Sequence, residues 1–236
     1  MIKQASTKTA PVVSSPAAER QPYQRSPAPA EGALRRGDWV EMGLKLLVEE
    51  GIDAVKITRL ADGLKVTRGS FYWHFKDRAD LLSELIARWE NRNTGVVVAA
   101  AEEASSLAEG ILSLFDAWLD GERFDPRLDS AMRDWARQSP EVKFAVARAD
   151  DLRVTAFTGL FERAGFEATE AFIRARVLYF AQVGYYALDI SEPTERRFSY
   201  LEAYYKGFTG KDLDPHLAET YRARRAGDFD RESWRT

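Results

Sequence analysis

Cysteine is absent from the 236-residue chain. Its absence excludes disulfide bonds and thiolate chemistry and fits a reducing compartment, so we expect a cytoplasmic protein. The chain also lacks any run approaching the ~18 consecutive apolar residues of a transmembrane helix, so no membrane partner is expected. The first residues contain no apolar segment of the kind found in secretory signals.

Groupings of catalytic residues are missing as well. The two histidines, His74 and His216, are isolated, and no His/Glu pair has the spacing of a metal site. There is no glycine-rich phosphate loop, and the acidic residues fall at ordinary surface spacing. We therefore expect no enzyme activity, no cofactor and no metal, and we interpret His216 as structural.

The segment from Lys56 to Arg78 has the pattern of two short helices joined by a tight turn. Its first half has apolar residues at positions i, i+3, i+4 and i+7, the stripe of an amphipathic helix. Thr67 stands where a second helix would begin, and its hydroxyl can cap a free backbone N–H. Phe71 and Phe75 are four residues apart and can share one buried face. The stripe consists of Ile57, Leu60, Ala61 and Leu64.

The remaining face of this second helix is broad, polar and aromatic. It holds Arg68, Gly69, Ser70, Tyr72, Trp73 and His74. In and around this face four basic residues stand against a single acid, Asp77, and such an excess is what neutralisation of phosphates requires. A helix with a thin apolar seam and this kind of face suits insertion into a nucleic-acid groove. The basic residues are Lys65, Arg68, Lys76 and Arg78.

The net charge of −3 does not contradict nucleic-acid binding, because the charge is unevenly distributed. Residues 34–92 carry 11 Lys and Arg against 10 Asp and Glu, whereas residues 93–236 carry 19 against 25. The acidic excess therefore lies outside the candidate binding segment.

These residues resemble the DNA-binding domain of the tetracycline-repressor (TetR) family of bacterial transcriptional regulators. The match includes Leu60-Ala61, Leu64, the string Val66–Phe75 (VTRGSFYWHF), Asp77 and Leu81-Leu82, and its Tyr-x-His-Phe ending is the most specific part. The motif covers roughly Arg35 to Arg92, and the rest of the chain matches only in helix order and length. The resemblance implies an all-α fold of about nine helices. A three-helix helix-turn-helix domain would be followed by a C-terminal helical domain for ligand binding and dimerisation.

The resemblance also implies which residues contact DNA. Arg68 is the best candidate for a bidentate contact to guanine, with a phosphate contact or a solvated charge as alternatives. Tyr72 would meet a base edge, a thymine methyl group or a phosphate. Trp73 would contact the backbone or take part in packing. The full set is Thr67, Arg68, Gly69, Ser70, Tyr72, Trp73, His74 and Arg78, with Thr58 and Lys65 as weaker candidates.

Two positions depart from the family pattern. Lys56 stands where the family often has a threonine N-cap, and Lys65 stands where the turn often has glycine. If this turn requires a positive φ, Lys65 adopts it at a steric cost. Gly43 lies within the first helix, where we expect close packing against a neighbouring helix.

The chain outside the motif divides by composition. Residues 1–33 contain five of the nine prolines and few large apolar side chains, so we predict a disordered arm. Arg20 and Arg25 could bring this arm to DNA, but a solvated tail is the favoured interpretation. Residues 34–93 form the expected DNA-binding domain, 94–210 the effector-binding and dimerisation domain, and 211–236 a polar, frayed C-terminal tail that could include a short helix near Leu217.

Helix signals set the expected layout of the second domain. Asp77, the Asp125-Pro126 pair and the Ser139-Pro140 pair are helix starts, and the helix from Asp77 is expected to reach about Asn93. Further helices are predicted over 96–121, 126–138, 140–164, 171–190 and 194–210.

Two features of this domain point to partners. The helix over 171–190 is apolar almost all round and must be covered on two sides, so we predict that it forms a homodimer interface with 194–208. Gly184 would allow a close crossing there, and ordinary core packing is the alternative. The candidate effector pocket is lined by Phe115, Trp118, Trp135, Phe157 and Phe180, although aromatic residues at helical spacing are more often core.

We therefore predict a sequence-specific regulator that binds a double-stranded DNA operator as a homodimer and is released by an unknown small-molecule effector. A repressor is the main interpretation. The alternatives are an activator of the same fold, and a helical scaffold or small-molecule-binding dimer that does not contact DNA.

Overall fold

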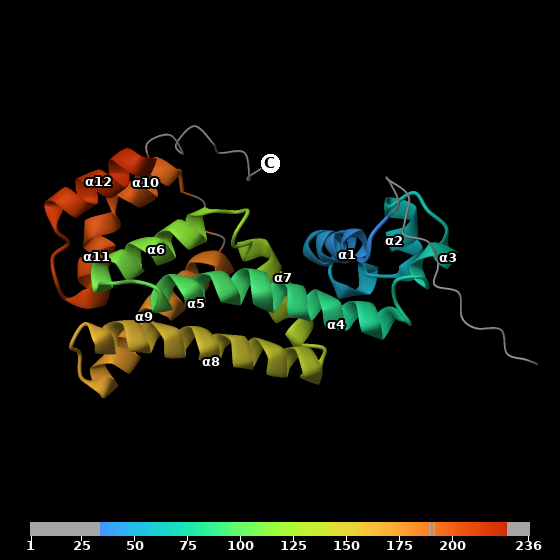
Figure 1. Ribbon diagram of the computed structural model, residues 1–236, viewed down its shortest axis with the longest axis horizontal. Helices are drawn as coiled ribbons and strands as arrows, with labels where there is room; N and C mark the ends of the chain where they lie inside the picture. The colour runs from blue at the N-terminus through green and yellow to red at the C-terminus, as the bar shows by residue number, and fades with distance from the viewer. Residues whose placement is uncertain (1–33, 189, 191, 226–236) are drawn as a thin grey trace, which may run out of the picture. The chain divides into compact units, whose positions relative to one another are not determined.

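The computed structural model describes residues 34–188, 190 and 192–225, and the arm expected over 1–33 lies outside them. Within the described residues the chain is helical and contains no strand, which confirms the all-α prediction (Figure 1). None of the helices in this part of the chain is long and apolar enough to cross a membrane.

The N-terminal helices build the predicted helix-turn-helix unit. Gly43 is buried, and a Cβ atom at this position would lie 3.0 Å from Cδ2 of Leu85, so α1 (Arg36–Glu50) and α4 (Arg78–Trp89) approach closely, as expected. Asp77 caps α4 as predicted, since its Oδ1 accepts a 2.9 Å hydrogen bond from the Asp80 N–H. The elements are α1 (Arg36–Glu50), η1 (Ile52–Ala54), α2 (Ile57–Gly63), α3 (Arg68–Phe71) and α4 (Arg78–Trp89).

The helix that begins at α4 does not end near Asn93, as the sequence suggested. It passes through a π-helical turn, η2 (Glu90–Thr94), and continues directly as α5 (Gly95–Glu102) (Figure 1). The predicted helix over 96–121 is instead interrupted at 103–106, and α6 (Leu107–Leu119) begins there. Ser106 caps the start of α6, because its hydroxyl accepts a 3.2 Å hydrogen bond from the Glu109 N–H.

The C-terminal helices begin where the caps predicted. Oδ1 of Asp125 accepts from the Arg127 N–H at 2.9 Å, and Oγ of Ser139 accepts from the Val142 N–H at 3.4 Å. The helix expected over 194–210 is divided at Tyr200, which adjoins both pieces. The elements are α7 (Pro126–Ala136), α8 (Pro140–Arg163), α9 (Ala168–Ala187), α10 (Thr194–Ser199) and α11 (Leu201–Thr209).

The segment expected to be a polar tail from residue 211 contributes to the core up to residue 225. It forms α12 (Pro215–Arg225), in which Ala218 and Tyr221 are buried against the C-terminal helices. Arg225 pairs with Asp116 of α6 at 2.7 Å and fixes the end of this helix. The polar composition was misleading because its few apolar residues share one face.

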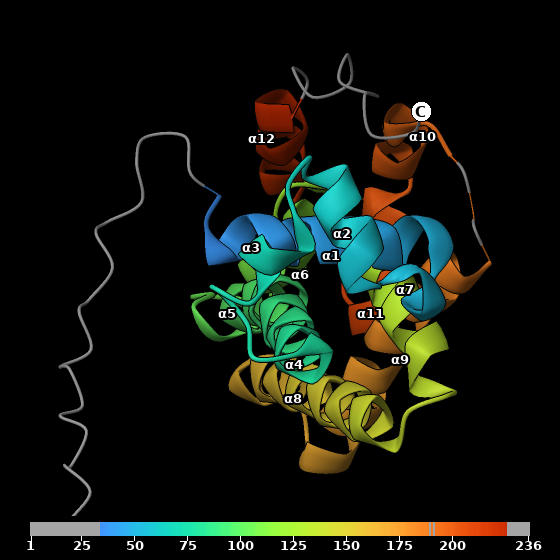
Figure 2. The same cartoon turned by 90° about the vertical axis from the view of Figure 1, so that its right-hand side faces the viewer.

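Two hydrophobic clusters hold the helices together. One joins α5, α6, α9, α11 and α12 to the C-terminal half of α8. The other joins the helix-turn-helix unit to α7 and the N-terminal half of α8, and Figure 2 looks onto the end of the fold that carries this unit. The residues that α7 and α8 supply to this second cluster are Leu128, Met132, Trp135, Val142, Ala145, Val146 and Ala149.

Candidate nucleic-acid interface

The turn between α2 and α3 uses the left-handed conformation at Lys65, whose φ is 56°. The Val66 N–H donates to the Ala61 carbonyl at 2.9 Å, and the Lys65 N–H donates to the Asp62 carbonyl at 3.1 Å. This pair of bonds is the Schellman arrangement that normally places glycine at the left-handed position. The expected positive φ is therefore confirmed, and Lys65 projects from the turn as an exposed cation.

Buried aromatic rings fix the orientation of α3. Phe71 and Phe75 are 0% and 2% exposed, and their rings stack with centroids 5.2 Å apart. The Trp39 ring of α1 meets Phe71 edge-on at 5.4 Å. This anchor on one side of α3 leaves its opposite side facing outward.

The outward side carries the predicted contact residues. Tyr72 and Trp73 are 61% and 78% exposed, an unusual state for such large apolar rings. Thr67 occupies the N-cap position, but its hydroxyl makes no capping bond within the described chain, contrary to prediction. Its exposed hydroxyl can instead meet a ligand. Arg68 and Gly69 are also exposed, and Ser70 and His74 are partly buried.

Uncompensated positive charge surrounds this face. Lys56, Lys65, Arg68 and Lys76 are exposed, and none of them forms an ion pair with any residue that the structure describes. Arg59 differs, because both its terminal nitrogens bind the Glu50 carboxylate at 2.6 Å. Thr58, the neighbour of Arg59 in the first turn of α2, is exposed as well. The face can therefore neutralise phosphates without first breaking ion pairs.

Arg78, one of the predicted contact residues, is held by bonds within the helix-turn-helix unit. Its Nε donates to the Val55 carbonyl at 2.6 Å, and its Nη2 donates to the Ile52 carbonyl at 3.1 Å. The partly buried guanidinium therefore ties α4 to η1, which argues against the predicted contact to DNA.

Arg36 is a residue of this region that the sequence did not reveal. Its Nη1 donates to the His74 carbonyl at the end of the α3 segment, and its Nη2 lies 3.1 Å from carboxylate oxygens of both Asp80 and Glu84. Its guanidinium also lies over the Phe75 ring. Because its partners are 38 to 48 residues away, no local pattern could have identified it.

The predicted effector residues do not lie together. Trp118 and Phe157 line an enclosed cavity of about 10 Å³, roughly the space of one water molecule. Phe115 packs beside that wall, with its ring centroid 6.1 Å from that of Trp118. Trp135 belongs to the cluster around the helix-turn-helix unit, and Phe180 is half-exposed on α9. The cavity is also lined by Val97, Phe124, Asp129, Arg153, Tyr179, Gln182, Val183 and Tyr186.

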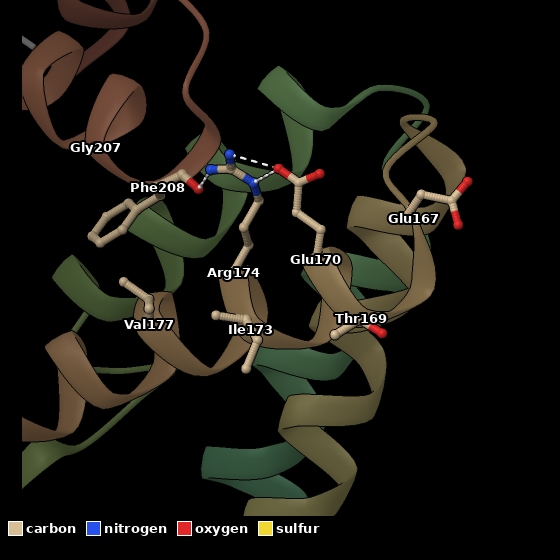
Figure 3. A pocket seen from close by; sticks show the side chains of 8 residues that line it. All are labelled: Glu167, Thr169, Glu170, Ile173, Arg174, Val177, Gly207 and Phe208. Atoms are coloured by element: carbon tan, nitrogen blue, oxygen red, sulfur yellow. Dashed lines mark hydrogen bonds and ion pairs between the residues drawn. The ribbon is translucent and has the colours of Figure 1, made fainter.

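A larger, open groove of about 550 Å³ lies between α9 and α11 (Figure 3). Ile173, Val177 and Phe208 form its apolar side. Arg174 crosses it, with Nε 2.8 Å from a Glu170 carboxylate oxygen and Nη1 donating to the Phe208 carbonyl at 2.9 Å. Because these bonds occupy the guanidinium, the groove is mainly an apolar surface. No group of three or more candidate metal ligands occurs among the described residues.

The sequence similarity to known proteins is concentrated in the residues of this interface. Residues 40–85 match the family of bacterial regulatory proteins described as the tetR family. The HTH-type transcriptional regulator AcrR of Shigella flexneri is 39% identical over 51 residues, which are 22% of this chain and 22% of AcrR. The tetracycline repressor protein class G of Vibrio anguillarum is 40% identical over 52 residues, 22% of this chain and 25% of the repressor. These alignments span a quarter or less of each relative.

The similarity of fold extends further along the chain. The crystal structure of E. coli NemR in its reduced form superposes with a TM-score of 0.58. The superposition covers 76% of this chain and 98% of NemR at 16% sequence identity, so it is a likeness of fold.

Proposed function

We propose that this chain, whose residues 40–85 match the tetR family of bacterial regulatory proteins, is a sequence-specific DNA-binding repressor that works as a homodimer and is released by a small molecule. The single observation that carries DNA binding is the outward face of α3. Arg68, Tyr72 and Trp73 are exposed there on a segment anchored from behind by buried rings. Related proteins with this motif are named as repressors, which favours repression over activation.

Dimerisation is part of the proposal because α3 is short. A four-residue helix reaches few base pairs, and a useful specificity requires two copies on a near-palindromic site. The outward side of α9 supplies an apolar stripe at helical spacing, and Tyr200, Tyr204 and Phe208 extend it along α10 and α11 as a row of neighbouring rings. The stripe consists of Ile173, Val177, Phe180 and Leu188.

This surface fits a second copy of the chain. The groove between α9 and α11 lies within it, so a helix of the partner could pack there. Gly184 and Gly207 have no described atom within 4 Å of a built Cβ, so both leave room for close helix approach. A stripe of half-exposed apolar residues on one protein is a typical interface signature.

The effector part of the proposal rests on the enclosed cavity. It lies among α5, α6, α7, α8 and α9 and is bordered by aromatic rings together with the buried Asp129–Arg153 pair. Its present size admits no drug-sized molecule, so binding requires side chains to move apart. The partly buried α9 residues Val183 and Tyr186 form the wall through which this could occur. A ligand changes DNA affinity only if it prefers one conformation.

The proposal is tested by selecting bound sequences from randomised duplexes and measuring mobility shifts over a range of salt concentrations. We expect a near-palindromic site, and binding that weakens steeply with salt. Arg68→Ala should remove preference for the selected site over random duplex while the dimer persists. The proposal is overturned if the wild type enriches no sequence, or if Arg68→Ala keeps full preference.

A further inference from the structure

The π turn at Glu90–Thr94 joins the DNA-binding unit to the C-terminal helices within one continuous helix. A π turn contains one more residue than the equivalent α turn, and such turns often occur at functional sites. Here it buries two polar side chains, Asn93 at 0% and Thr94 at 5% exposure. Buried polar groups need hydrogen-bond partners, so the conformation of this turn depends on what those side chains meet.

Residues of α7 and α8 supply these partners. Asn93 Nδ2 donates to the Asp125 carbonyl at 2.7 Å, and Arg153 Nε donates to the Thr94 hydroxyl at 3.1 Å. One residue before the turn, Trp89 Nε1 donates to Asp129 Oδ1 at 2.9 Å. The π turn is therefore held from the side by a set of buried polar bonds centred on Asp129 and Arg153.

Asp129 and Arg153 are buried within a larger cluster of opposite charges, whose other members, Arg133 and Asp150, are partly buried. Arg153 binds both oxygens of Asp129, at 2.9 and 3.2 Å. Burial alone would raise the pKa of Asp129, but the Arg153 guanidinium outweighs that effect and lowers the pKa, so the carboxylate stays ionised. Arg133 binds Asp150 at 2.7 Å, and the Tyr179 hydroxyl donates to Asp150 at 2.6 Å.

A π turn differs from a regular α turn by one inserted residue. If Glu90–Thr94 adopted α geometry without losing a residue, α4 would rotate by about 100° and shift by about 1.5 Å relative to α5. Such a change would carry α1 to α3 with it, because they share a core with α4, and it would shift this unit against α7 and α8, which pack into the same core. The polar bonds from α7 and α8 favour the π form. Their loss would shift the equilibrium toward the other form.

We propose that the Asp129–Arg153 pair positions the helix-turn-helix unit by holding the π turn of the α4–α5 helix. We also propose that this turn switches between a π form and an α form. The inference rests on the proposed function and extends it to named residues. Asp129, Arg153 and Tyr179 also form a wall of the enclosed cavity, so a molecule that enters the cavity acts directly on the group that holds the turn.

Two variants each remove one of these bonds, to the turn in one case and to the residue just before it in the other. Thr94→Val keeps the side-chain shape and loses the oxygen that accepts from Arg153, and Trp89→Phe loses the donor to Asp129. Asp129→Asn is avoided because it leaves a buried Arg153 charge uncompensated and endangers folding. The matched control is Arg148→Gln, because Arg148 pairs with Glu90 of the same turn from α8 but is half-exposed.

The first readout is half-site spacing, which a merely structural role would not alter. The DNA is the site selected by the wild type, together with copies lengthened or shortened by one base pair at the centre. The measured quantity is the affinity for the selected site divided by the affinity for a respaced site. Thr94→Val and Trp89→Phe should lower this ratio by about fivefold, and Arg148→Gln should leave it unchanged. Unchanged ratios in both variants, or an equal change in the control, overturn the inference.

The second readout does not involve DNA. Hydrogen exchange of the amides in residues 86–98 should quicken in Thr94→Val and not in Arg148→Gln, and equal exchange in the two overturns the inference. Failure of the wild type to select any sequence would overturn the proposed function alone, and hydrogen exchange would still decide the role of the turn.

Deletion of the exposed Asn91 adds a rescue test. It removes the extra residue of the π turn, so α4 and α5 can keep their relative orientation through a regular α turn. In that background Thr94→Val should no longer change the spacing ratio, and a full effect there overturns the inference.

Discussion

The guanidinium of Arg36 lies 4.1 Å from the centroid of the Phe75 ring. Arg36 is the first residue of α1, whereas Phe75 closes the segment that carries the outward face of α3. The same guanidinium reaches the His74 carbonyl and two carboxylates of α4. One side chain therefore joins the start of α1, the end of the segment that carries the outward face of α3, and α4.

Replacing Arg36 by alanine should loosen this junction. We expect the free energy of unfolding to fall by about 1–2 kcal/mol, because a cation–π contact and partly exposed hydrogen bonds are lost. Operator affinity of the folded variant should fall as well, since the His74 carbonyl loses its donor. Urea unfolding and mobility shifts measure the two effects. Arg88→Ala is the control, because Arg88 makes an exposed α4–α1 pair with Glu41 that does not reach the reading segment.

Arg78 and Arg68 should separate stability from binding. Arg78→Ala removes two bonds to backbone carbonyls and should lower the free energy of unfolding by about 1–3 kcal/mol. The variant that remains folded should keep its phosphate contacts. Its salt dependence of DNA binding should then match that of the wild type, whereas Arg68→Ala should reduce it. A shallower salt dependence in Arg78→Ala would mean that this guanidinium reaches DNA after all.

Lys65→Gly should stabilise the turn between α2 and α3. The native φ of 56° is unfavourable for a residue with a Cβ atom but not for glycine. After allowing for the greater flexibility of glycine in the unfolded chain, we expect a gain of about 0.5–1 kcal/mol. Lys65→Ala retains the Cβ atom and controls for loss of the charge. Thermal unfolding distinguishes the two, and an equal stability of both variants would contradict the steric argument.

A charge placed on the outer stripe of α9 should separate the dimer without unfolding the chain. Phe180→Asp introduces a carboxylate where the side chain is 50% exposed, so the monomer loses little core packing. We expect sedimentation to show at least about a tenfold weaker self-association, because a charge would be buried in the dimer. Phe144→Asp on α8 is the matched control at 68% exposure and should leave association unchanged.

Alkaline pH should destabilise the protein through Tyr179. Burial raises the pKa of this phenol from the ordinary 10.0 to about 12, against the opposing effect of Arg153 and Arg133. Between these values the unfolded chain releases the proton that the folded chain retains, so stability falls as pH rises, by about 1.4 kcal/mol per pH unit. Urea unfolding at about pH 9 and about pH 11 should show a smaller loss for Tyr179→Phe than for the wild type.

The sequence predicted the parts of the fold that depend on nearby residues. The helix starts at Asp77, Asp125 and Ser139 were predictable because each side chain bonds to a backbone N–H two or three residues later. The continuation through the π turn was not, because it depends on donors and acceptors of α7 and α8. The place of α12 in the core was hidden for the same reason, since Arg225 and Asp116 are 109 residues apart.

The candidate site follows the same division. The outward face of α3 was predictable because its anchor, Phe71 and Phe75, lies within one helical turn of it. The backbone bonds of Arg78 were not predictable because its carbonyl partners precede it by 23 and 26 residues. Aromatic periodicity could not reveal that Phe180 faces outward while Phe157 faces inward, because both sides of these helices carry apolar residues.

The cluster that joins the helix-turn-helix unit to α7 and α8 bears on the engineering of hybrid regulators. A fragment cut after residue 93 would expose the surfaces that pack against Met132, Trp135 and Val142. Grafting the first 93 residues onto an unrelated sensor would therefore create an apolar seam with nothing to fill it. A working chimera should include α7 and the first half of α8 together with the helix-turn-helix unit, or redesign the surface that these two helices cover.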